Sequence, residues 1–172
     1  MLETILIILG SILGLYILIA ILDIIFVLSF KSILNKHNKS LGVILMSKLD
    51  NIRLLFDIMI RLGVEVDEKF LLIFKEIRIE DLLSQDTPEC ASIRSKLSML
   101  RDEAMFIASK NSFLEKHDEF RIAKRNVLES DNVYRINIAM YNADVLGYNY
   151  WIGFLPTRYI YKILKVKRKE II

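Results

Sequence analysis

The stretch ILIILGSILGLYILIAILDIIFVLSF, Ile5–Phe30, decides the fold of this chain. Its first part, Ile5–Leu22, contains no charged residue and no proline. A helix rises ~1.5 Å per residue, and about 20 apolar residues cross the hydrocarbon core of a bilayer. The sequence therefore predicts a transmembrane anchor over residues 1–30, with the remaining chain presented at a membrane surface.

Other interpretations of this stretch fit the residues less well. A cleaved signal peptide needs a basic start and a small-residue cleavage site, but the only charged side chain ahead of the stretch is Glu3. A lipoprotein signal would need a cysteine near its end, and the only cysteine is Cys90. A buried core helix is usually shorter and is polar on one face. The stretch is therefore interpreted as an uncleaved anchor.

Asp23 is the one charged residue within the stretch. An ionised carboxylate at the middle of a bilayer costs ~2.5–3.5 kcal/mol on insertion scales, and this cost falls toward the end of a span. A span that ends near Phe26 places Asp23 close to the interface. The alternative is a proton or ion site, which would have no second charged group in the stretch.

The flanking charges predict the orientation of the anchor. Lys31, Lys36 and Lys39 follow the stretch, whereas only the amino terminus and Glu3 precede it. The positive-inside rule then places the C-terminal side in the cytoplasm. The predicted location is the cell membrane, with a single span and a cytoplasmic C-terminal domain.

The composition of the rest of the chain favours long helices. Pro88 and Pro156 are its only prolines, and few glycines lie outside the anchor. Heptad-like apolar spacing runs through residues 41–62, 66–83, 87–114 and 120–155. We expect an all-α chain with a roughly four-helix antiparallel bundle over residues 41–157, after a basic juxtamembrane linker at 31–40.

The last of these helices has two polar interruptions in its apolar seam, Lys124 and Asp131. A charged residue at a seam position conflicts with burial, so a break near residues 130–132 is possible. At the start of the third helix, Thr87-Pro88-Glu89 is a strong initiation signal, and Cys90 falls directly behind it.

Catalytic and ligand-binding motifs are not found in the sequence. There is no Gly-rich phosphate loop and no nucleophile–base pattern, and a single cysteine leaves no cysteine-based metal site. His37 and His117 have no His or Cys partner at helical spacing. We therefore expect a protein that is not an enzyme, with no catalytic residues, no cofactor and no metal.

Two Tyr-Asn pairs stand one heptad apart near the C-terminus, Tyr141-Asn142 and Tyr148-Asn149, and Leu155-Pro156 follows them. This arrangement resembles the C-terminal signature of the LemA family, in which two Tyr-Asn pairs precede a Phe-Pro. The resemblance covers about 45 residues, and Leu155 replaces the usual Phe. The paired arginines and Pro-Asn of the family's first segment are missing after Arg61.

The resemblance implies a bacterial single-pass membrane protein with a helical-bundle domain and brings no catalytic mechanism. From the residues themselves, the tyrosine rings are expected to pack in the seam, and their hydroxyls need partners. The asparagines, one position on, could hydrogen-bond across helices. A structural role for these residues is favoured over a ligand site.

The C-terminal segment, residues 158–172, alternates apolar and basic residues. It carries a net charge of +5 within a total of +3, so residues 1–157 carry −2 and do not resemble a nucleic-acid binder. In a tethered protein such a segment could contact anionic lipid headgroups; the alternative is a disordered or bundle-packed tail. Its six basic residues are Arg158, Lys162, Lys165, Lys167, Arg168 and Lys169.

Three functions remain open. The favoured one is a non-catalytic scaffold or adaptor that binds a protein partner, itself or anionic lipid at the membrane. The alternatives are a lipid-surface or pore-forming protein that acts through the anchor and the basic tail, and an enzyme or sensor with an unrecognised site.

Overall fold

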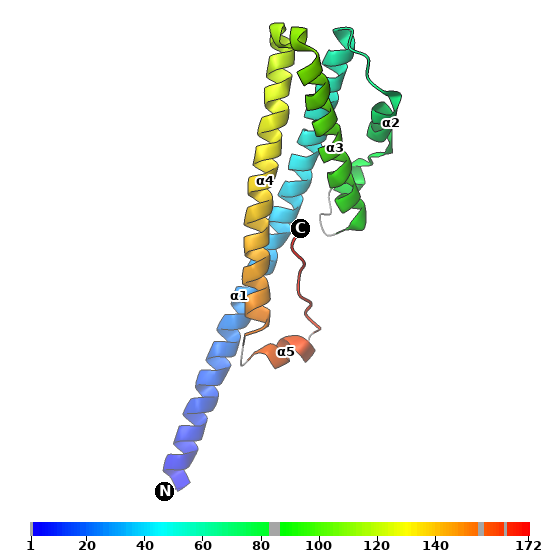
Figure 1. Ribbon diagram of the computed structural model, residues 1–172. Helices are drawn as coiled ribbons and strands as arrows, with labels where there is room; N and C mark the ends of the chain where they lie inside the picture. Colours follow the sequence, from blue (N-terminus) through cyan, green and yellow to red (C-terminus); the bar gives the residue numbers. More distant parts are fainter. Residues whose placement is uncertain (1, 83–86, 155–156, 164) are drawn as a thin grey trace. The chain divides into compact units, whose positions relative to one another are not determined.

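The computed structural model describes residues 2–82, 87–154, 157–163 and 165–172, and every regular element in them is helical (Figure 1). The prediction of an all-helical chain with one long apolar N-terminal helix is confirmed. The elements are α1 (Leu2–Arg61), α2 (Glu68–Glu76), η1 (Ile79–Leu82), α3 (Pro88–Lys110), η2 (Ser112–Lys116), α4 (Asp118–Ile152) and α5 (Arg158–Ile163), where η marks a 3₁₀ helix.

The chain divides into two compact units. We call Met1–Lys36 with Tyr141–Ile171 the anchor unit, and His37–Met140 the helical unit. Helices α1 and α4 each contribute to both units. Residues 31–40, which were predicted to form a linker, are part of α1 and are helical throughout.

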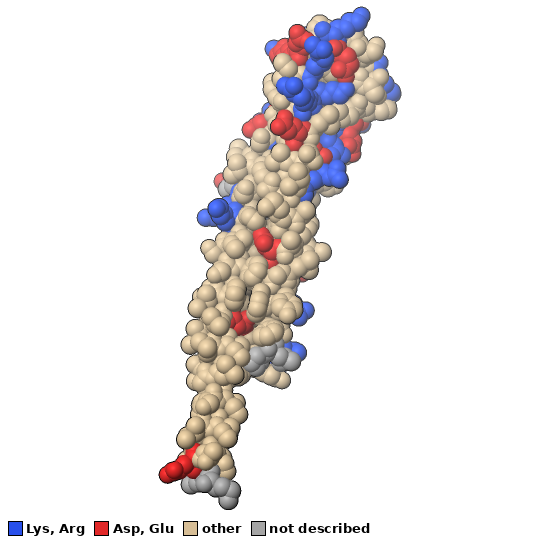
Figure 2. All heavy atoms as spheres, turned by 90° about the vertical axis from the view of Figure 1, so that its left-hand side faces the viewer, with Lys and Arg blue, Asp and Glu red and all other residues tan. Residues whose placement is uncertain are grey.

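The N-terminal part of α1 is long and apolar enough to cross a membrane. Side chains from Glu3 to Leu18 are exposed, and those of Ile7 and Leu6 are 69% and 60% exposed. Figure 2 shows no Lys or Arg on the drawn face of this part of α1. An exposed apolar surface of this length on all sides is typical of a helix that faces lipid.

The helical unit is built from the apolar seams that the sequence predicts. Helices α1 and α4 run antiparallel, as two ion pairs between them show: Lys48 pairs with Asp131, and Arg61, further along α1, pairs with Glu119, which comes earlier in α4. Helix α2 packs on α1 through an edge-to-face contact of Phe74 with Phe56, whose ring centroids are 5.5 Å apart. The fully buried side chains of this unit include Leu41, Leu45, Ile52, Leu55, Phe56, Met59, Leu82, Leu97, Leu100 and Phe120.

Local signals set the helix boundaries in this unit. The Thr87 hydroxyl accepts a hydrogen bond from the Cys90 amide at 3.2 Å, so the predicted cap of α3 is present. The Asp67 carboxylate accepts one from the Lys69 amide at 3.0 Å and caps α2. Gly63 follows the end of α1 with a φ of 85°, a conformation that glycine adopts without steric cost.

The predicted possibility of a break near residues 130–132 is wrong, because α4 continues through them. Asp131 is buried there with two cationic partners. The Lys48 ammonium lies 2.6 Å from Oδ1, and the Arg101 guanidinium lies 2.6 Å from Oδ2. Each carboxylate oxygen therefore meets a charged donor, which offsets the loss of hydration inside the unit.

Electrostatics around Asp131 agree with this geometry. Burial raises the pKa of its carboxyl group, but Lys48 and Arg101 lower it by more, so the net pKa is below its ordinary value. The Lys48 ammonium also lies over the ring of Tyr134, 5.4 Å from the centroid. Burial raises the pKa of Tyr134 to about 12.

Candidate functional site

The anchor unit brings the family-like residues of α4 against the C-terminal segment. The Asn149 amide donates to the Lys169 carbonyl at 2.8 Å and accepts from the Lys169 amide at 2.9 Å. One side chain thus satisfies both main-chain groups of Lys169, as a neighbouring β-strand would. The segment is held on α4 through its backbone, and Asn149 binds an extended chain where the sequence suggested another helix.

Tyr141 and Tyr148 lie on the buried side of α4, and their side chains are almost fully enclosed. The Tyr148 hydroxyl lies 3.4 Å from the Lys167 carbonyl, to which it donates. Burial raises the pKa of the Tyr148 phenol. Asn142 is half-buried on the same helix. Leu155 and Pro156, the remaining residues of the family-like signature, lie outside the described residues.

Asp23 is 2% exposed in the anchor unit, although it belongs to the predicted span. The Thr157 hydroxyl, from the segment just ahead of α5, donates a hydrogen bond to Asp23 Oδ2. Tyr161 of α5 is buried beside this carboxylate, and burial together with Asp23 raises the pKa of its phenol well above the ordinary range. The sequence predicted that Asp23 lies at the membrane interface. In the structure, Asp23 is enclosed by residues of the same chain.

Aromatic side chains at the end of α4 gather at Phe26 of α1, three residues after Asp23. The ring of Trp151 stacks on that of Phe26, with centroids 4.9 Å apart and planes 6° apart. Phe154 and Tyr150 extend this group, each with its centroid 5.6 Å from that of Trp151. Tyrosine and tryptophan are enriched at the headgroup level of membranes, and this group lies just past the uncharged stretch of α1.

The close approach of α4 to α1 depends on a small residue. A Cβ added to Gly147 would lie 2.9 Å from Cε1 of the Phe30 ring. Helix α4 can therefore pack against α1 one turn beyond Phe26 because position 147 has no side chain. This contact and the Phe26–Trp151 stack determine which residues of α1 lie beside the C-terminal end of α4.

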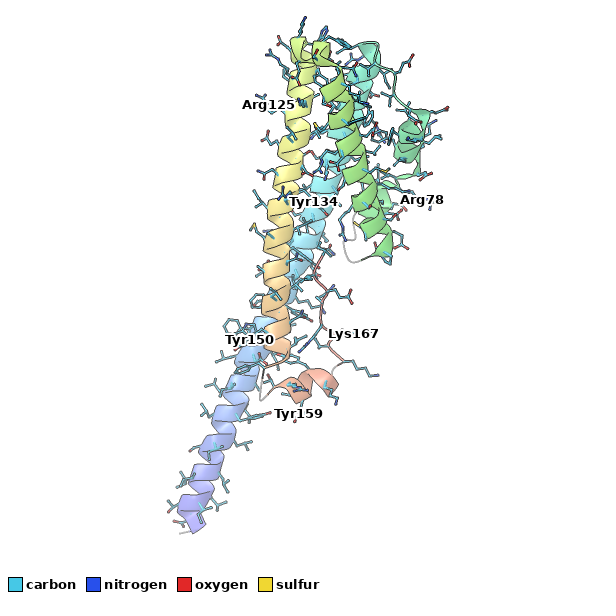
Figure 3. All side chains as sticks on the ribbon, viewed as in Figure 1. Arg78, Arg125, Tyr134, Tyr150, Tyr159 and Lys167 are labelled. Atoms are coloured by element: carbon cyan, nitrogen blue, oxygen red, sulfur yellow. The ribbon has the colours of Figure 1, made fainter. Side chains whose placement is uncertain are left out.

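Most basic side chains of the C-terminal segment remain exposed although its backbone is bound. Figure 3 shows where three exposed residues lie: Tyr150 on α4, Tyr159 on α5, and Lys167 on the final segment, residues 165–172. Tyr150 and Tyr159 are 64% and 66% exposed. Of the six basic residues predicted to contact lipid, five are exposed and Lys169 is half-buried: Arg158, Lys162, Lys165, Lys167 and Arg168.

The helical unit has a separate surface feature, a shallow groove of about 330 Å³ between α1 and α4. Its lining combines apolar and polar side chains: Ile44, Ser47, Asn51, Asn126, Glu129, Ser130 and Val133. Ile136 and Met140 continue the apolar side on α4 and are 53% and 52% exposed. Glu129 forms no ion pair with any described residue.

Sequence patterns could not reveal several of these contacts. Asp23 and Thr157 are 134 residues apart, and Asn149 bonds to a segment with no regular structure of its own. The one available signal was the charge of Asp23 within an apolar run, but we interpreted it as a carboxylate near the membrane interface and expected no partner from the C-terminal segment. The groove was also missed, because exposed apolar residues on an amphipathic helix resemble the edge of its buried face.

Comparisons of the chain with family models, with curated proteins and with solved structures find no match.

Proposed function

We propose that the chain is a membrane-anchored, non-catalytic helical scaffold of the LemA type, with its helical unit in the cytoplasm. The exposed apolar part of α1 supports anchoring. Lysines Lys31, Lys36 and Lys39 support the cytoplasmic orientation, and all three belong to helical parts of α1.

A roughly four-helix antiparallel arrangement of the helical unit is part of this proposal. The antiparallel pairing of α1 with α4 supports it, as does the Lys96–Glu76 ion pair of 2.7 Å between α3 and α2. The second helix is short, because α2 has nine residues and the chain continues through η1.

Support for the LemA type comes from the positions of the Tyr-Asn pairs. Tyr141 and Tyr148 are buried, and Asn149 fixes the final segment through two hydrogen bonds. These contacts give a structural reason for a tyrosine followed by an asparagine on a helix. The tyrosine ring packs on the buried side of α4, and the asparagine amide forms hydrogen bonds with the backbone of the final segment.

The observation that carries the scaffold function is the groove between α1 and α4. The groove between two neighbouring helices can accommodate the apolar face of a third helix. Ile44 and Val133 supply apolar contact, and Glu129 supplies a negative charge that forms no ion pair with any described residue. We therefore propose that the groove binds an amphipathic helix of a partner protein that presents a basic residue to Glu129.

Site-specific photocross-linking in native membranes tests this function. A photoreactive amino acid at Val133 is expected to give adducts of a defined larger mass with a heterologous protein, because Val133 lines the groove. The same amino acid at Ser95, an exposed residue of α3 outside the groove, is the matched control and should give none. Glu129→Lys is expected to reduce the Val133 adduct about tenfold through like-charge repulsion.

Other outcomes would contradict the scaffold. A ladder of self-adducts from Val133 would favour an oligomer, and equal adducts from Val133 and Ser95 would remove the groove as the binding surface. The pore alternative has less support, because Thr157 donates a hydrogen bond to Asp23 inside the anchor unit. Asp23 is therefore not available as an exposed charge along a channel.

A further inference from the structure

A second pocket lies in the anchor unit, at the end of α4. It is shallow, has a volume of about 450 Å³ and is lined by Asn149, Tyr150, Gly153, Phe154 and Arg168. Its lining residues include one arginine and two aromatic residues, and no acidic residue is among them. A site of this chemistry attracts an anionic group attached to an apolar body.

The backbone of the final segment determines where Arg168 lies. Because Asn149 holds both main-chain groups of Lys169, the preceding residue is placed directly over α4. A Cβ added to Gly153 would lie 3.4 Å from the Arg168 Nη2 atom. The guanidinium therefore lies across the end of α4, within van der Waals distance of position 153. Arg168 has no carboxylate partner among the described residues, so its charge is free for a ligand.

Aromatic residues place the pocket at a defined level of the anchor. Phe154 lies 5.6 Å from Trp151 between ring centroids, and Trp151 stacks on Phe26. The uncharged part of α1 ends at Leu22, and the first lysine after it is Lys31. Phe26 falls between them, where the phosphate groups of a bilayer would lie in an anchored chain.

The charge around the pocket has the sign that anionic lipids require. Arg158, Lys162, Lys165 and Lys167 are exposed on α5 and the final segment, and Glu170 is the one acid there. Each basic residue near an anionic surface raises the binding constant for that surface about fivefold. Arginine differs from lysine in that its planar fork binds two phosphate oxygens at once.

We propose that this pocket binds the phosphate headgroup of an anionic phospholipid, with Arg168 on the phosphate oxygens. Tyr150 donates its exposed hydroxyl to the headgroup, and Phe154 contacts the start of the acyl region. The proposal rests on the membrane anchoring given above and adds a specific lipid site to it. In this site the final segment is the part that recognises the lipid.

The fluorescence of Trp151 provides a direct test, because it is the one tryptophan in the chain. The full-length protein is placed in phosphatidylcholine nanodiscs that contain either brominated phosphatidylglycerol or the same fraction of brominated phosphatidylcholine. Bromine quenches tryptophan at contact distance. Stronger quenching by phosphatidylglycerol at equal mole fraction is the expected result. Equal quenching by the two lipids would overturn the proposal.

Substitutions separate a pocket from general surface charge. Arg168→Gln is expected to lower the preference for phosphatidylglycerol over phosphatidylcholine by more than about tenfold, the effect of losing a charge-assisted hydrogen bond to phosphate. Arg168→Lys keeps the charge and should restore only part of the preference. Lys165→Gln removes the same charge from an exposed residue outside the pocket, so the preference should fall by no more than about fivefold, the factor that surface attraction alone contributes. Equal losses in Arg168→Gln and Lys165→Gln would overturn the pocket.

Two further controls identify the ligand and separate a failure of this inference from a failure of the proposed membrane anchoring. Inorganic phosphate, added at constant ionic strength, should leave the stronger quenching by phosphatidylglycerol unchanged. If phosphate abolishes this stronger quenching, the pocket is a site for soluble anions and the lipid assignment is overturned. Recovery of the protein with the nanodiscs reports anchoring separately. A chain that enters nanodiscs without lipid preference contradicts this inference alone, whereas a chain that does not enter them contradicts the anchor.

Discussion

Replacing Asp131 with alanine is expected to lower the free energy of unfolding of the helical unit by about 3–5 kcal/mol. The substitution leaves the ammonium of Lys48 buried, with its side chain 4% exposed and its carboxylate partner gone. Removal of one member of a buried ion pair is costly because the remaining charge has neither water nor a counter-ion. Cys90 offers a probe of this loss, since it is the only thiol and is fully buried.

The rate at which Cys90 of the full-length chain reacts with a thiol reagent in mild detergent measures opening of the helical unit. Asp131→Ala should raise this rate between about a hundredfold and a few thousandfold, since 1.4 kcal/mol corresponds to tenfold. Glu119→Ala removes the Arg61 ion pair, in which both side chains are more than half exposed, and should cost less than about 1 kcal/mol. Similar rates for the two variants would contradict the account of Asp131.

A second large effect is expected at Thr157. Thr157→Val keeps the shape of the side chain but removes the donor to Asp23, so a buried carboxylate loses a hydrogen bond. An unsatisfied buried polar group costs about 1–3 kcal/mol, and a charged group costs more. We expect α5 and the segment that follows it to detach from the anchor unit in a larger fraction of molecules.

Limited trypsin digestion measures this detachment, because Lys165, Lys167 and Arg168 are cleavage sites on the bound segment. Mass spectrometry of the released C-terminal peptides should show cleavage at least about fivefold faster in Thr157→Val than in the native protein. Thr157→Ser retains the hydroxyl and should cleave at close to the native rate. Native-like cleavage of Thr157→Val would show that the Asp23 contact does not hold the segment in place.

The helices could be predicted well because their causes are local. Apolar spacing, the Thr87 cap and the glycine at position 63 are each properties of a few neighbouring residues, and they set the observed ends of α1 and α3. The continuity of α4 through Asp131 could not be predicted in the same way. Its stability there depends on Lys48, which is 83 residues away.

The candidate sites show the same limit. The basic segment and the Tyr-Asn pairs were recognisable from the sequence, but their relation was not. Asn149 meets Lys169 only after the chain has turned at α5 and run back along α4, and one hydrogen-bonding amide does not specify its partner. Likewise Gly153, which directly follows the end of α4, is a sequence signal for a helix end, but it does not reveal that the Arg168 guanidinium lies across this position.

The central claim, that a cytoplasmic helical unit is tethered by α1, is tested most directly by topology labelling. Cys90 is buried and is not expected to react with the reagent in the folded protein. A new thiol is therefore placed at the exposed Ser112 of η2 as Ser112→Cys. A membrane-impermeant thiol reagent is applied to cells with an intact plasma membrane and to opened cells. Thr4→Cys, ahead of the apolar stretch, is the control for the opposite side.

The account predicts that Ser112→Cys is labelled only after the cells are opened, whereas Thr4→Cys is labelled in intact cells. Labelling of Ser112→Cys in intact cells would place the helical unit outside and contradict the account.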